Sequence, residues 1–418
     1  MTSKRHVWFS SLAAISILTG TFTAWHFILA KPIPQAGTAI AGGDIAPVRI
    51  LRDSKSTVAG IAVDAVNNEV FMSDENRASI LSFNRTDNSE SREGEPLHHI
   101  MGDHTNLQFV CGITVDPRNK EVYAVNNDVA DNMVVYGYEQ DGDSAPAREL
   151  KVDHGAWGVA MDQDNEEVAI TTEHINKISI YRRTAVGKEL PLRIIQGPRT
   201  GIADPHGTFI DPKNNEIYVV NTGAWHLVRT GEGEENGVPD WWKAFDLSKK
   251  VQTQPALPSL LPSTGRYFPP SITVYSRTAN GDAVPLRTLQ GKNTQFSNPL
   301  AVYVDYEHNE IAVANDGGNS ILIFDSKANG DVAPKRVIAG PDTGIKFPSG
   351  VWVDTKNDEI WSANWGNHSA TVYPRSAQGN VKPKRIIRTA AEGTPLNGMG
   401  NPSAMIYDEQ RDELLVPN

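Results

Sequence analysis

Residues 302–315 read VYVDYEHNEIAVAN, and this stretch holds the pattern that decides the fold. Apolar side chains alternate up to Asp305, a short polar turn follows, and a second apolar run begins after Glu310. Period-two alternation on both sides of a polar turn is typical of two antiparallel β-strands joined by a hairpin. The stretch therefore predicts two neighbouring strands of one sheet.

The same phrase occurs seven times between residues 61 and 415. The first strand of each copy ends in an aspartate: Asp64, Asp116, Asp162, Asp211, Asp305, Asp354 and Asp408. The copies follow one another about every 49 residues, and the one interval that is twice as long holds an insertion at about 223–268. A repeat of this length is typical of stacked supersecondary units, so a chain of 418 residues need not contain three separate domains.

Two further strands complete most of the units. The third is an apolar run, such as residues 320–324, and it occurs in six units. The fourth begins with proline and carries an arginine, as in residues 334–338, and turns such as Asn329-Gly330-Asp331 lead into it. Because proline lacks the N–H that a strand ladder needs, the fourth strand is predicted at the outer edge of its sheet. Four antiparallel strands per repeat predict an all-β fold, the β-propeller.

The repeat resembles that of the NHL-repeat and TolB-like bacterial β-propellers. The resemblance rests on Val-Asp-x-x-x-Asn-Glu-Ile-Tyr-Val-x-Asn followed by Asn-Ser-Ile-x-Val-Tyr, and it extends over residues 46–418. No Trp-Asp dipeptide recurs, which makes a WD40 propeller the weaker interpretation, and no double glycine recurs once per blade as in kelch repeats. The resemblance implies a propeller but no single activity, because such propellers include scaffolds, binding modules, lactonases and lyases.

Seven copies predict seven blades, with the six blades of NHL-like propellers as the alternative. Residues 47–51 match the fourth-strand phrase although they precede the first unit. We therefore expect this N-terminal strand to complete the blade that contains residues 403–418 and to close the ring. The last unit has no third strand, which favours a truncated reading frame over direct pairing of 47–51 with 413–418.

Residues 1–41 are predicted to be a targeting segment that precedes a propeller at 42–418. Lys4 and Arg5 stand before residues 7–30, an apolar stretch without Lys, Arg, Asp or Glu. This stretch is predicted to form an apolar helix, either a cleaved signal peptide or a retained signal anchor, and both alternatives stay open. In both cases the propeller is exported to the periplasm or the extracellular space. Its contact with a membrane would be through residues 7–30 alone.

The composition limits the partners and the covalent chemistry. The formal net charge is −11 and no basic run interrupts the chain, so a nucleic acid is an unsuitable partner. A single cysteine, Cys111, excludes an intrachain disulfide and a multi-cysteine zinc site. We interpret Cys111 as a small buried apolar residue rather than a nucleophile. A monomer is expected.

A polar residue ends the second strand in most units, at Asp74, Asn126, Thr172, Asn221, Asn315, Asn364 and Asn418. Asparagine and aspartate often bond the backbone of their own turn, and this is the first interpretation. The alternative is a polar ring around the central channel that holds a cation or sugar hydroxyls. A gluconolactonase-like hydrolase would use Asp74, Asn126, Asn221 and Asn315 around a divalent cation.

A second set of equivalent positions, just before the first strand, breaks the repeat: Ala59, Cys111, Trp157, His206, Leu300, Ser349 and Ser403. His206 would join His154 and His226 near the channel, as in the metal-bearing lyases of related propellers. Zinc needs three or four converging ligands, and the sequence does not show whether these loops converge. The alternative is that all three are hydrogen-bonded or exposed loop histidines.

The insertion at about 223–268 lies between the second and third strands of the fourth unit. A loop this long in a compact fold is usually functional or disordered. A short helix after Pro239 would place Trp241 and Phe245, which are four residues apart, on the same face. Any helix of the exported body is expected at 230–262, and helix is expected in fewer than about one residue in ten of that body.

The expected function is an exported binding or scaffold module for a protein, peptide or glycan ligand, without a resident cofactor. The ligand is expected beneath the insertion, because the fourth unit gathers His206, Asn221, Trp225, His226 and Trp241 there. Asn126, Asn315 and Asn364 would add polar contacts. A metal-dependent hydrolase or a histidine–metal lyase on the same propeller is the alternative, and it would require a divalent cation.

Overall fold

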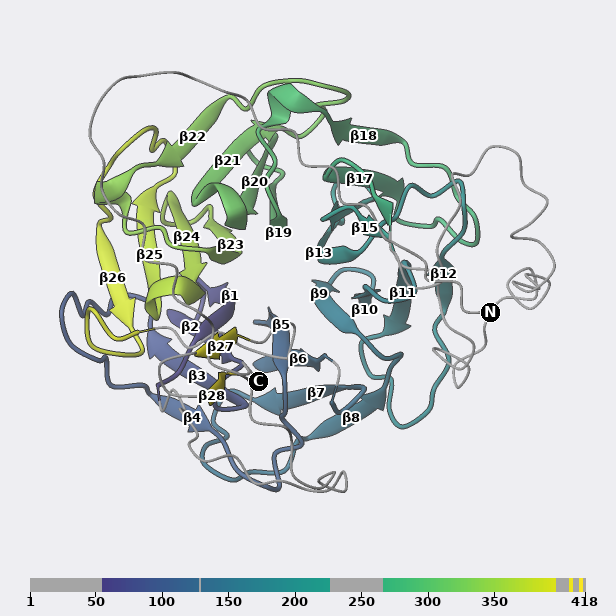
Figure 1. Ribbon diagram of the computed structural model, residues 1–418. Helices are drawn as coiled ribbons and strands as arrows, with labels where there is room; N and C mark the ends of the chain where they lie inside the picture. The colour runs from purple at the N-terminus through teal and green to yellow at the C-terminus, as the bar shows by residue number, and fades with distance from the viewer. Residues whose placement is uncertain (1–54, 128, 226–265, 396–405, 409–412, 416–418) are drawn as a thin grey trace, which may run out of the picture. The chain divides into compact units, whose positions relative to one another are not determined.

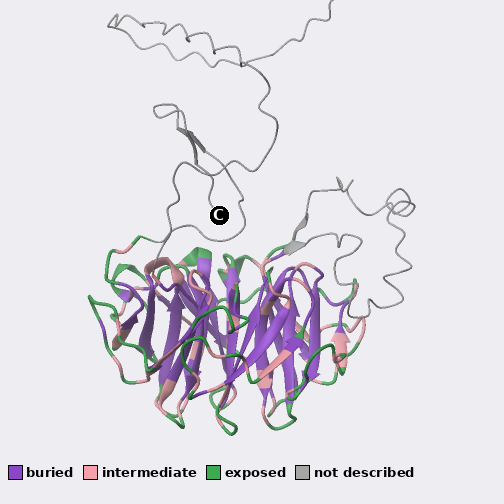
Figure 2. Cartoon of the chain, turned by 90° about the horizontal axis from the view of Figure 1, so that it is seen from below, coloured by how far each residue is buried: buried purple, intermediate pink, exposed green. Residues whose placement is uncertain are grey.

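A computed structural model describes residues 55–127, 129–225, 266–395, 406–408 and 413–415. It shows six four-stranded antiparallel sheets, each built from one run of the chain and arranged as the blades of a β-propeller around a central channel (Figure 1). The three inner strands of each blade are mostly buried, the outer strands are mostly intermediate, and most exposed residues lie in the turns (Figure 2). The prediction of an all-β propeller is confirmed.

The strands of each blade run from the channel outwards. Blade 1 contains β1 (Val58–Asp64), β2 (Glu69–Asp74), β3 (Ser79–Asn84) and β4 (His98–Ile100). Blade 2 contains β5 (Val110–Asp116), β6 (Glu121–Asn126), β7 (Asn132–Gly137) and β8 (Arg148–Lys151). Blade 3 contains β9 (Ala156–Asp162), β10 (Glu167–Thr172), β11 (Lys177–Arg182) and β12 (Arg193–Ile195).

The second half of the ring has the same order. Blade 4 contains β13 (Pro205–Asp211), β14 (Glu216–Asn221), β17 (Ser271–Ser276) and β18 (Arg287–Gln290). Blade 5 contains β19 (Pro299–Asp305), β20 (Glu310–Asn315), β21 (Ser320–Asp325) and β22 (Arg336–Ala339). Blade 6 contains β23 (Pro348–Asp354), β24 (Glu359–Asn364), β25 (Ser369–Pro374) and β26 (Arg385–Arg388).

The prediction of seven blades is wrong, and the six-bladed alternative is correct. The seventh copy of the phrase forms only a hairpin, β27 (Ile406–Asp408) with β28 (Glu413–Leu415), which is a separate two-stranded sheet among the described residues. Blade 6 instead contacts blade 1 directly. The Ser349 hydroxyl of blade 6 donates a hydrogen bond to the carbonyl of Ala59 in blade 1 over 2.6 Å. The hairpin phrase alone therefore overcounts blades, since a blade also needs the third and fourth strands.

Ring closure uses the strands of blades 1 and 6 themselves. Blade 6 carries its own outer strand, β26, and the β3–β4 loop of blade 1 runs beside it, with the Ser89 N–H donating to the carbonyl of Ile386 over 2.6 Å. The predicted closing strand, residues 47–51, lies outside the described residues. Among the described residues, blades 1 and 6 each contain four strands of their own.

The repeated aspartate of each hairpin holds its turn. Asp354, for example, accepts the Asn357 N–H over 3.0 Å with one oxygen and the Asn357 side-chain amide over 2.7 Å with the other. The first strand therefore ends at this residue because its carboxylate binds the turn that follows.

The repeated glutamate at the start of the second strand binds cations from two blades. Glu310 receives both guanidinium arms of Arg336 in its own blade, over 2.8 and 2.7 Å, and Arg375 of the next blade approaches to 3.4 Å. Arg85 of blade 1 contacts Glu359 of blade 6 over 2.9 Å in the same way. The interface that closes the ring is therefore built like the others. The 1–2 interface differs, because Tyr138 takes the arginine position and donates to Asp64 over 3.0 Å.

The turns that precede the outer strands fasten each blade to the previous one. The glycine of each turn pairs with the outer strand of the preceding blade in five parallel bridges, for example Leu289 with Gly330. The next residue, Asp331, accepts the Asn293 N–H of blade 4 over 2.6 Å. The sequence pattern predicted only that these turns lead into the fourth strand. The structure shows that they also connect neighbouring blades.

Removing the Asp331 carboxylate should loosen one blade interface. We expect Asp331→Ala to lower the free energy of unfolding by about 1 kcal/mol, since the Asn293 N–H loses its acceptor. Asp331→Asn should be nearly neutral, because Asn380 accepts the Asp342 N–H over 2.8 Å at the equivalent position of blade 6. Denaturant unfolding of both variants measures this, and equal losses would contradict it.

Glycines bring the first strands close together around the channel. Gly60, Gly112, Gly158, Gly207 and Gly350 occupy one position of the first strand, where blade 5 has Ala301. A Cβ built on Gly158 would lie 2.3 Å from the carbonyl oxygen of His206 in the next blade. The inner ring is therefore packed backbone against backbone.

Helix in the described residues is limited to short 3-10 turns, η2 (Lys292–Thr294), η3 (Asp316–Gly318), η4 (Pro341–Thr343) and η5 (Trp365–Asn367), in agreement with the predicted low helix content. These turns lie outside residues 230–262, the segment where any helix was expected. None of the helices in the described residues has the length and apolar character to cross a membrane. The insertion leaves blade 4 between β14 and β17, where it was expected, and β15 (Ala224–Trp225) pairs with β16 (Arg266–Tyr267) at its base. Residues 226–265 and 1–41, with the predicted helices, lie outside the described residues.

Candidate functional site

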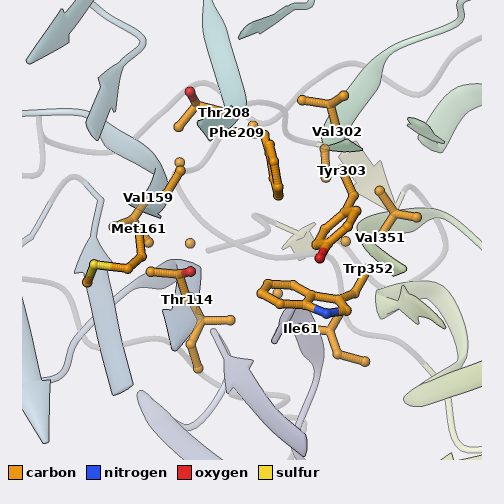
Figure 3. Close-up of a pocket in the computed structure, with 18 of the residues that line it drawn as sticks. Ile61, Thr114, Val159, Met161, Thr208, Phe209, Val302, Tyr303, Val351 and Trp352 are labelled. Atoms are coloured by element: carbon orange, nitrogen blue, oxygen red, sulfur yellow. The ribbon is translucent and has the colours of Figure 1, made fainter. Parts of the chain in front are cut away.

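The central channel encloses a cavity of about 290 Å³ lined by the first strands of all six blades. Phe209, Tyr303 and Trp352 stand on three successive blades and line one side, with ring centroids 4.6 and 4.8 Å apart (Figure 3). Met161 and Thr114 lie opposite this aromatic wall (Figure 3). The volume is at the small end of the range for ligand sites, so the cavity suits a small molecule.

One end of the channel, here called the mouth, is where first strands begin and second strands end. The strand register places these ends together, since Val58 pairs with Asp74 in blade 1 and Pro205 with Asn221 in blade 4. The members of both sets that belong to blades 1 to 6 therefore lie at the mouth, whereas Ser403 and Asn418 lie outside the described residues.

The polar residues that end the second strands bond within their own blades. Asn221 accepts the Ala203 N–H over 3.0 Å and donates to the Thr273 hydroxyl over 3.0 Å. The equivalent residues are equally engaged with their own blades: Asp74 with Thr57, Asn126 with Gln108, Asn315 with Ser297 and Asn364 with Thr371. Their geometry is that of turn caps rather than of a converging set of ligands.

The next residue along the chain carries the chemistry of the mouth. This position holds Glu75, Asn127, Glu173, Thr222, Asp316 and Trp365 in blades 1 to 6. Glu75 lines the cavity, and the Asn127 amide donates to Glu173 over 2.9 Å across a blade interface. This position therefore places carboxylates from three blades, Glu75, Glu173 and Asp316, at the mouth.

Glu173, Asp204 and His206 form the most compact polar cluster of the mouth. All three are buried, and one nitrogen or oxygen from each lies within 4.8 Å of the others. The His206 Nε2 is 3.4 Å from a Glu173 oxygen, and its Nδ1 is 3.8 Å from an Asp204 oxygen. The second Glu173 oxygen is 3.0 Å from the His174 Nε2.

The bonding of His206 fixes which ring nitrogen carries hydrogen. Its Nδ1 lies 3.1 Å from the carbonyl oxygen of Asp204, which can only accept, so Nδ1 donates. In the neutral ring Nε2 then has a lone pair that faces Glu173. The ring packs on Trp157 with centroids 4.3 Å apart, which holds its plane.

The surroundings shift the pKa values of three mouth carboxylates, Glu75, Asp316 and Glu173, in different directions. Burial raises the pKa of Glu75 to about 8, with the charges of Asp74 and Glu173 adding to the effect. Burial also raises the pKa of Asp316 to about 6, against the hydrogen bond from Trp365. For Glu173 the effect of burial is outweighed by His174 and His206, which lower its pKa. Glu173 is therefore the carboxylate most readily ionised at neutral pH.

Three oxygen atoms of the mouth have no hydrogen-bond partner among the described residues: Glu75 Oε2, Asn127 Oδ1 and Asp316 Oδ1. The three side chains are buried, with at most 5% of their surface exposed. Leaving a buried acceptor unpaired costs about 1–3 kcal/mol. The oxygens of Asn127 and Asp316 are suited to a donor or a cation, whereas Glu75, with its raised pKa, is mostly protonated at neutral pH.

The other predicted residues lie apart from this cluster or outside the described residues. His154 is bonded to Asp131 over 3.0 Å and packs on His174, so it does not join His206 in one ligand set. Trp225 lies in β15, while His226 and Trp241 lie outside the described residues. Cys111 is buried, with its thiol 3.7 Å from Glu75, in accord with a small buried role.

Sequence reasoning found His206 but missed Glu75, Asn127, Glu173, Asp204 and Asp316. The signal was available one residue beyond the position that was compared, where the repeat changes from Glu to Asn, Thr, Asp and Trp. Asp204 had no such signal, because it enters the mouth through a left-handed backbone conformation (φ 55°) just before β13.

No family profile and no curated protein matches the chain. Among solved structures, it is similar to Kuenenia stuttgartiensis hydrazine synthase, with 13% identity, a TM-score of 0.49 and coverage of 80% of this chain and 99% of the other. It is also similar to a functionally unknown protein from Desulfotomaculum acetoxidans, with 11% identity, a TM-score of 0.48 and coverage of 80% and 87%. These likenesses concern the propeller fold alone.

Proposed function

We propose that the protein is a binding module whose ligand enters the central channel at the mouth and occupies the cavity beneath. The cavity of about 290 Å³ with its aromatic wall is the observation that carries this proposal. Phe209, Tyr303 and Trp352 are only partly buried, so their faces remain available to a ligand. Aromatic faces of this kind pack on sugar rings and on other flat or apolar groups.

The size of the cavity favours a small ligand or one end of a larger one. A peptide side chain or a terminal sugar of a glycan fits the volume, whereas a folded protein would contact the rim. The unpaired acceptors at the mouth favour a ligand that donates hydrogen bonds or carries positive charge. The polar mouth and apolar wall together fix the orientation of such a ligand.

Export to the periplasm or the extracellular space, a monomeric state and kinship with NHL-repeat and TolB-like propellers belong to the same proposal. They rest on the sequence of residues 1–41 and on the repeat pattern. The hydrolase alternative has less support, since Asp74, Asn126, Asn221 and Asn315 bond within their own blades.

Filling the cavity should abolish ligand binding while the propeller stays folded. We expect Thr114→Trp to remove binding, because the indole would occupy the space opposite the aromatic wall (Figure 3). A library of small amino sugars, aromatic amines and polyols, screened by saturation-transfer NMR, supplies the probes. Competition between the compounds that bind shows whether they share one site. If binding changes the Trp fluorescence of the wild type but not that of Trp352→Phe, the compounds bind in the channel.

The matched control is Val66→Trp, which adds the same indole on an exposed turn residue (73% exposed). This variant should bind the same compounds as the wild type, with the same affinities. The proposal fails if no compound binds the wild type, or if Thr114→Trp retains every hit with unchanged affinity and a native melting transition.

A further inference from the structure

The mouth contains donor atoms arranged as ligands of a divalent transition metal. The observations are the separation of the His206 Nε2 and the Glu173 oxygen, the hydrogen bond of His206 Nδ1, and the unpaired oxygen of Asn127. Each is independent of the cavity, because Glu173, Asp204 and His206 do not line it.

The contact between His206 and Glu173 joins two groups that can both act as metal ligands. Nδ1 holds the ring hydrogen, so in the neutral ring Nε2 and the carboxylate oxygen direct lone pairs at one region while 3.4 Å apart. Two ligands at about 2.0–2.1 Å from a tetrahedral zinc ion lie about 3.3–3.4 Å from each other. The separation is therefore that of two ligands on one metal.

The surroundings of His206 are those of a metal-bound imidazole. A ligating histidine almost always donates its other N–H to a carbonyl or a carboxylate, which fixes the ring and its tautomer. Here the Asp204 carbonyl accepts that hydrogen over 3.1 Å. The Asp204 carboxylate, which accepts the Thr222 hydroxyl and lies 3.8 Å from the His206 Nδ1, is the third member of the cluster, whose ligand atoms lie within 4.8 Å of one another.

Asn127 contacts the cluster from blade 2. Its side chain is fully buried and donates to Glu173 over 2.9 Å, which leaves its Oδ1 without a partner beside the cluster. A buried amide oxygen of this kind is satisfied by a cation or by water held on that cation. Three blades, carrying Asn127, Glu173 and His206, thus contribute oxygen or nitrogen atoms to the cluster, while no lysine or arginine bonds to Glu173 among the described residues.

We propose that Glu173, Asp204 and His206 bind one zinc-class divalent cation at the mouth of the channel. One imidazole with two carboxylates suits a first-row metal such as Zn²⁺ better than Ca²⁺ or Mg²⁺, which prefer oxygen ligands alone. Three protein ligands leave a position for water or for a group of the molecule in the cavity.

The test is titration of the chelator-treated full-length protein with Zn²⁺ alone, followed by calorimetry and bound-metal analysis. We expect one equivalent of Zn²⁺ with micromolar or tighter affinity. His206→Ala and Glu173→Gln should each weaken binding at least about 10-fold. Thr114→Trp should bind Zn²⁺ normally, so failure of the cavity proposal and failure of this one are distinguishable.

The matched control is His104→Ala, which removes an exposed imidazole that pairs with Asp143 over 2.6 Å outside the cluster. It should bind Zn²⁺ as the wild type does. Should the mouth variants fail to fold, X-ray absorption of the wild-type zinc complex decides: nitrogen and oxygen neighbours with an imidazole signature support the site. Absence of saturable Zn²⁺ binding, unchanged affinity in folded His206→Ala, or sulfur neighbours would overturn it, as would tighter binding of Ca²⁺.

Discussion

Gly158→Val should destabilise the propeller by at least about 3 kcal/mol, one of the two largest effects expected from a single substitution. A Cβ at this position would lie 2.3 Å from the His206 carbonyl oxygen and 2.8 Å from the Thr171 hydroxyl oxygen. The first contact is with backbone, which cannot move without displacing β13. The first strands would have to separate, and thermal unfolding should show a melting temperature lower by at least about 5 °C.

The control is the reverse change in blade 5. Ala301 occupies the equivalent position, so this interface already accommodates a methyl group. Ala301→Gly should cost less than about 1 kcal/mol, chiefly through backbone entropy. A Gly158→Val protein as stable as the wild type would show that the inner ring is not limited by backbone contact.

The second large effect concerns Glu310. Its hydrogen bond with Arg336 lowers its pKa to about 2, and a further hydrogen bond with Lys335 lowers the pKa as well, although burial acts in the opposite direction. We expect Glu310→Gln to cost about 3 kcal/mol at pH 7, because the guanidinium of Arg336 loses its bidentate carboxylate while only 18% of that side chain is exposed. Arg375 of the next blade loses the same partner.

The pH dependence of this loss has a defined sign. A carboxylate whose pKa is lower in the folded than in the unfolded protein stabilises the fold above its ordinary pKa of 4.5, and that contribution disappears as the pH falls toward 2. The stabilities of wild type and Glu310→Gln should therefore converge between pH 4.5 and 2 in denaturant titrations. Glu139→Gln, on an exposed turn, is the control, and a constant difference down to pH 2 would contradict the assignment.

The sequence predicted the blade because each of its features acts locally. Alternation fixes the strands, Asp354 and its equivalents fix the turns through bonds three residues away, and proline before the fourth strand marks the edge. The number of blades was not predictable from the hairpin phrase, because the copy at 405–415 has the same local pattern and forms only β27 and β28. The first strands approach closely at the glycines at 60, 112, 158, 207 and 350, where an added Cβ would contact neighbouring atoms.

The candidate site was predictable only in part for a similar reason. His206 could be selected because it breaks the repeat, but its partners come from another blade and from a loop. Glu173 is 33 residues earlier in the chain and meets His206 only when blades 3 and 4 stand side by side. The asparagines at the strand ends, by contrast, were noticed because they repeat, and repetition here reflects the common need to cap a turn.

The turns between blades also determine how a partner can attach. A strand at the border of a sheet offers unpaired N–H and C=O groups, to which an extended segment of another chain can add. In five blades the glycine of the next blade's turn pairs with that border strand, as Gly379 does with Ile338, and in blade 6 the border beside Ile386 and Arg388 is taken by residues 89–94. Strand addition from outside is blocked at these points, which protects the ring from edge-to-edge polymerisation and leaves the loops and the channel as the accessible surfaces of the described residues.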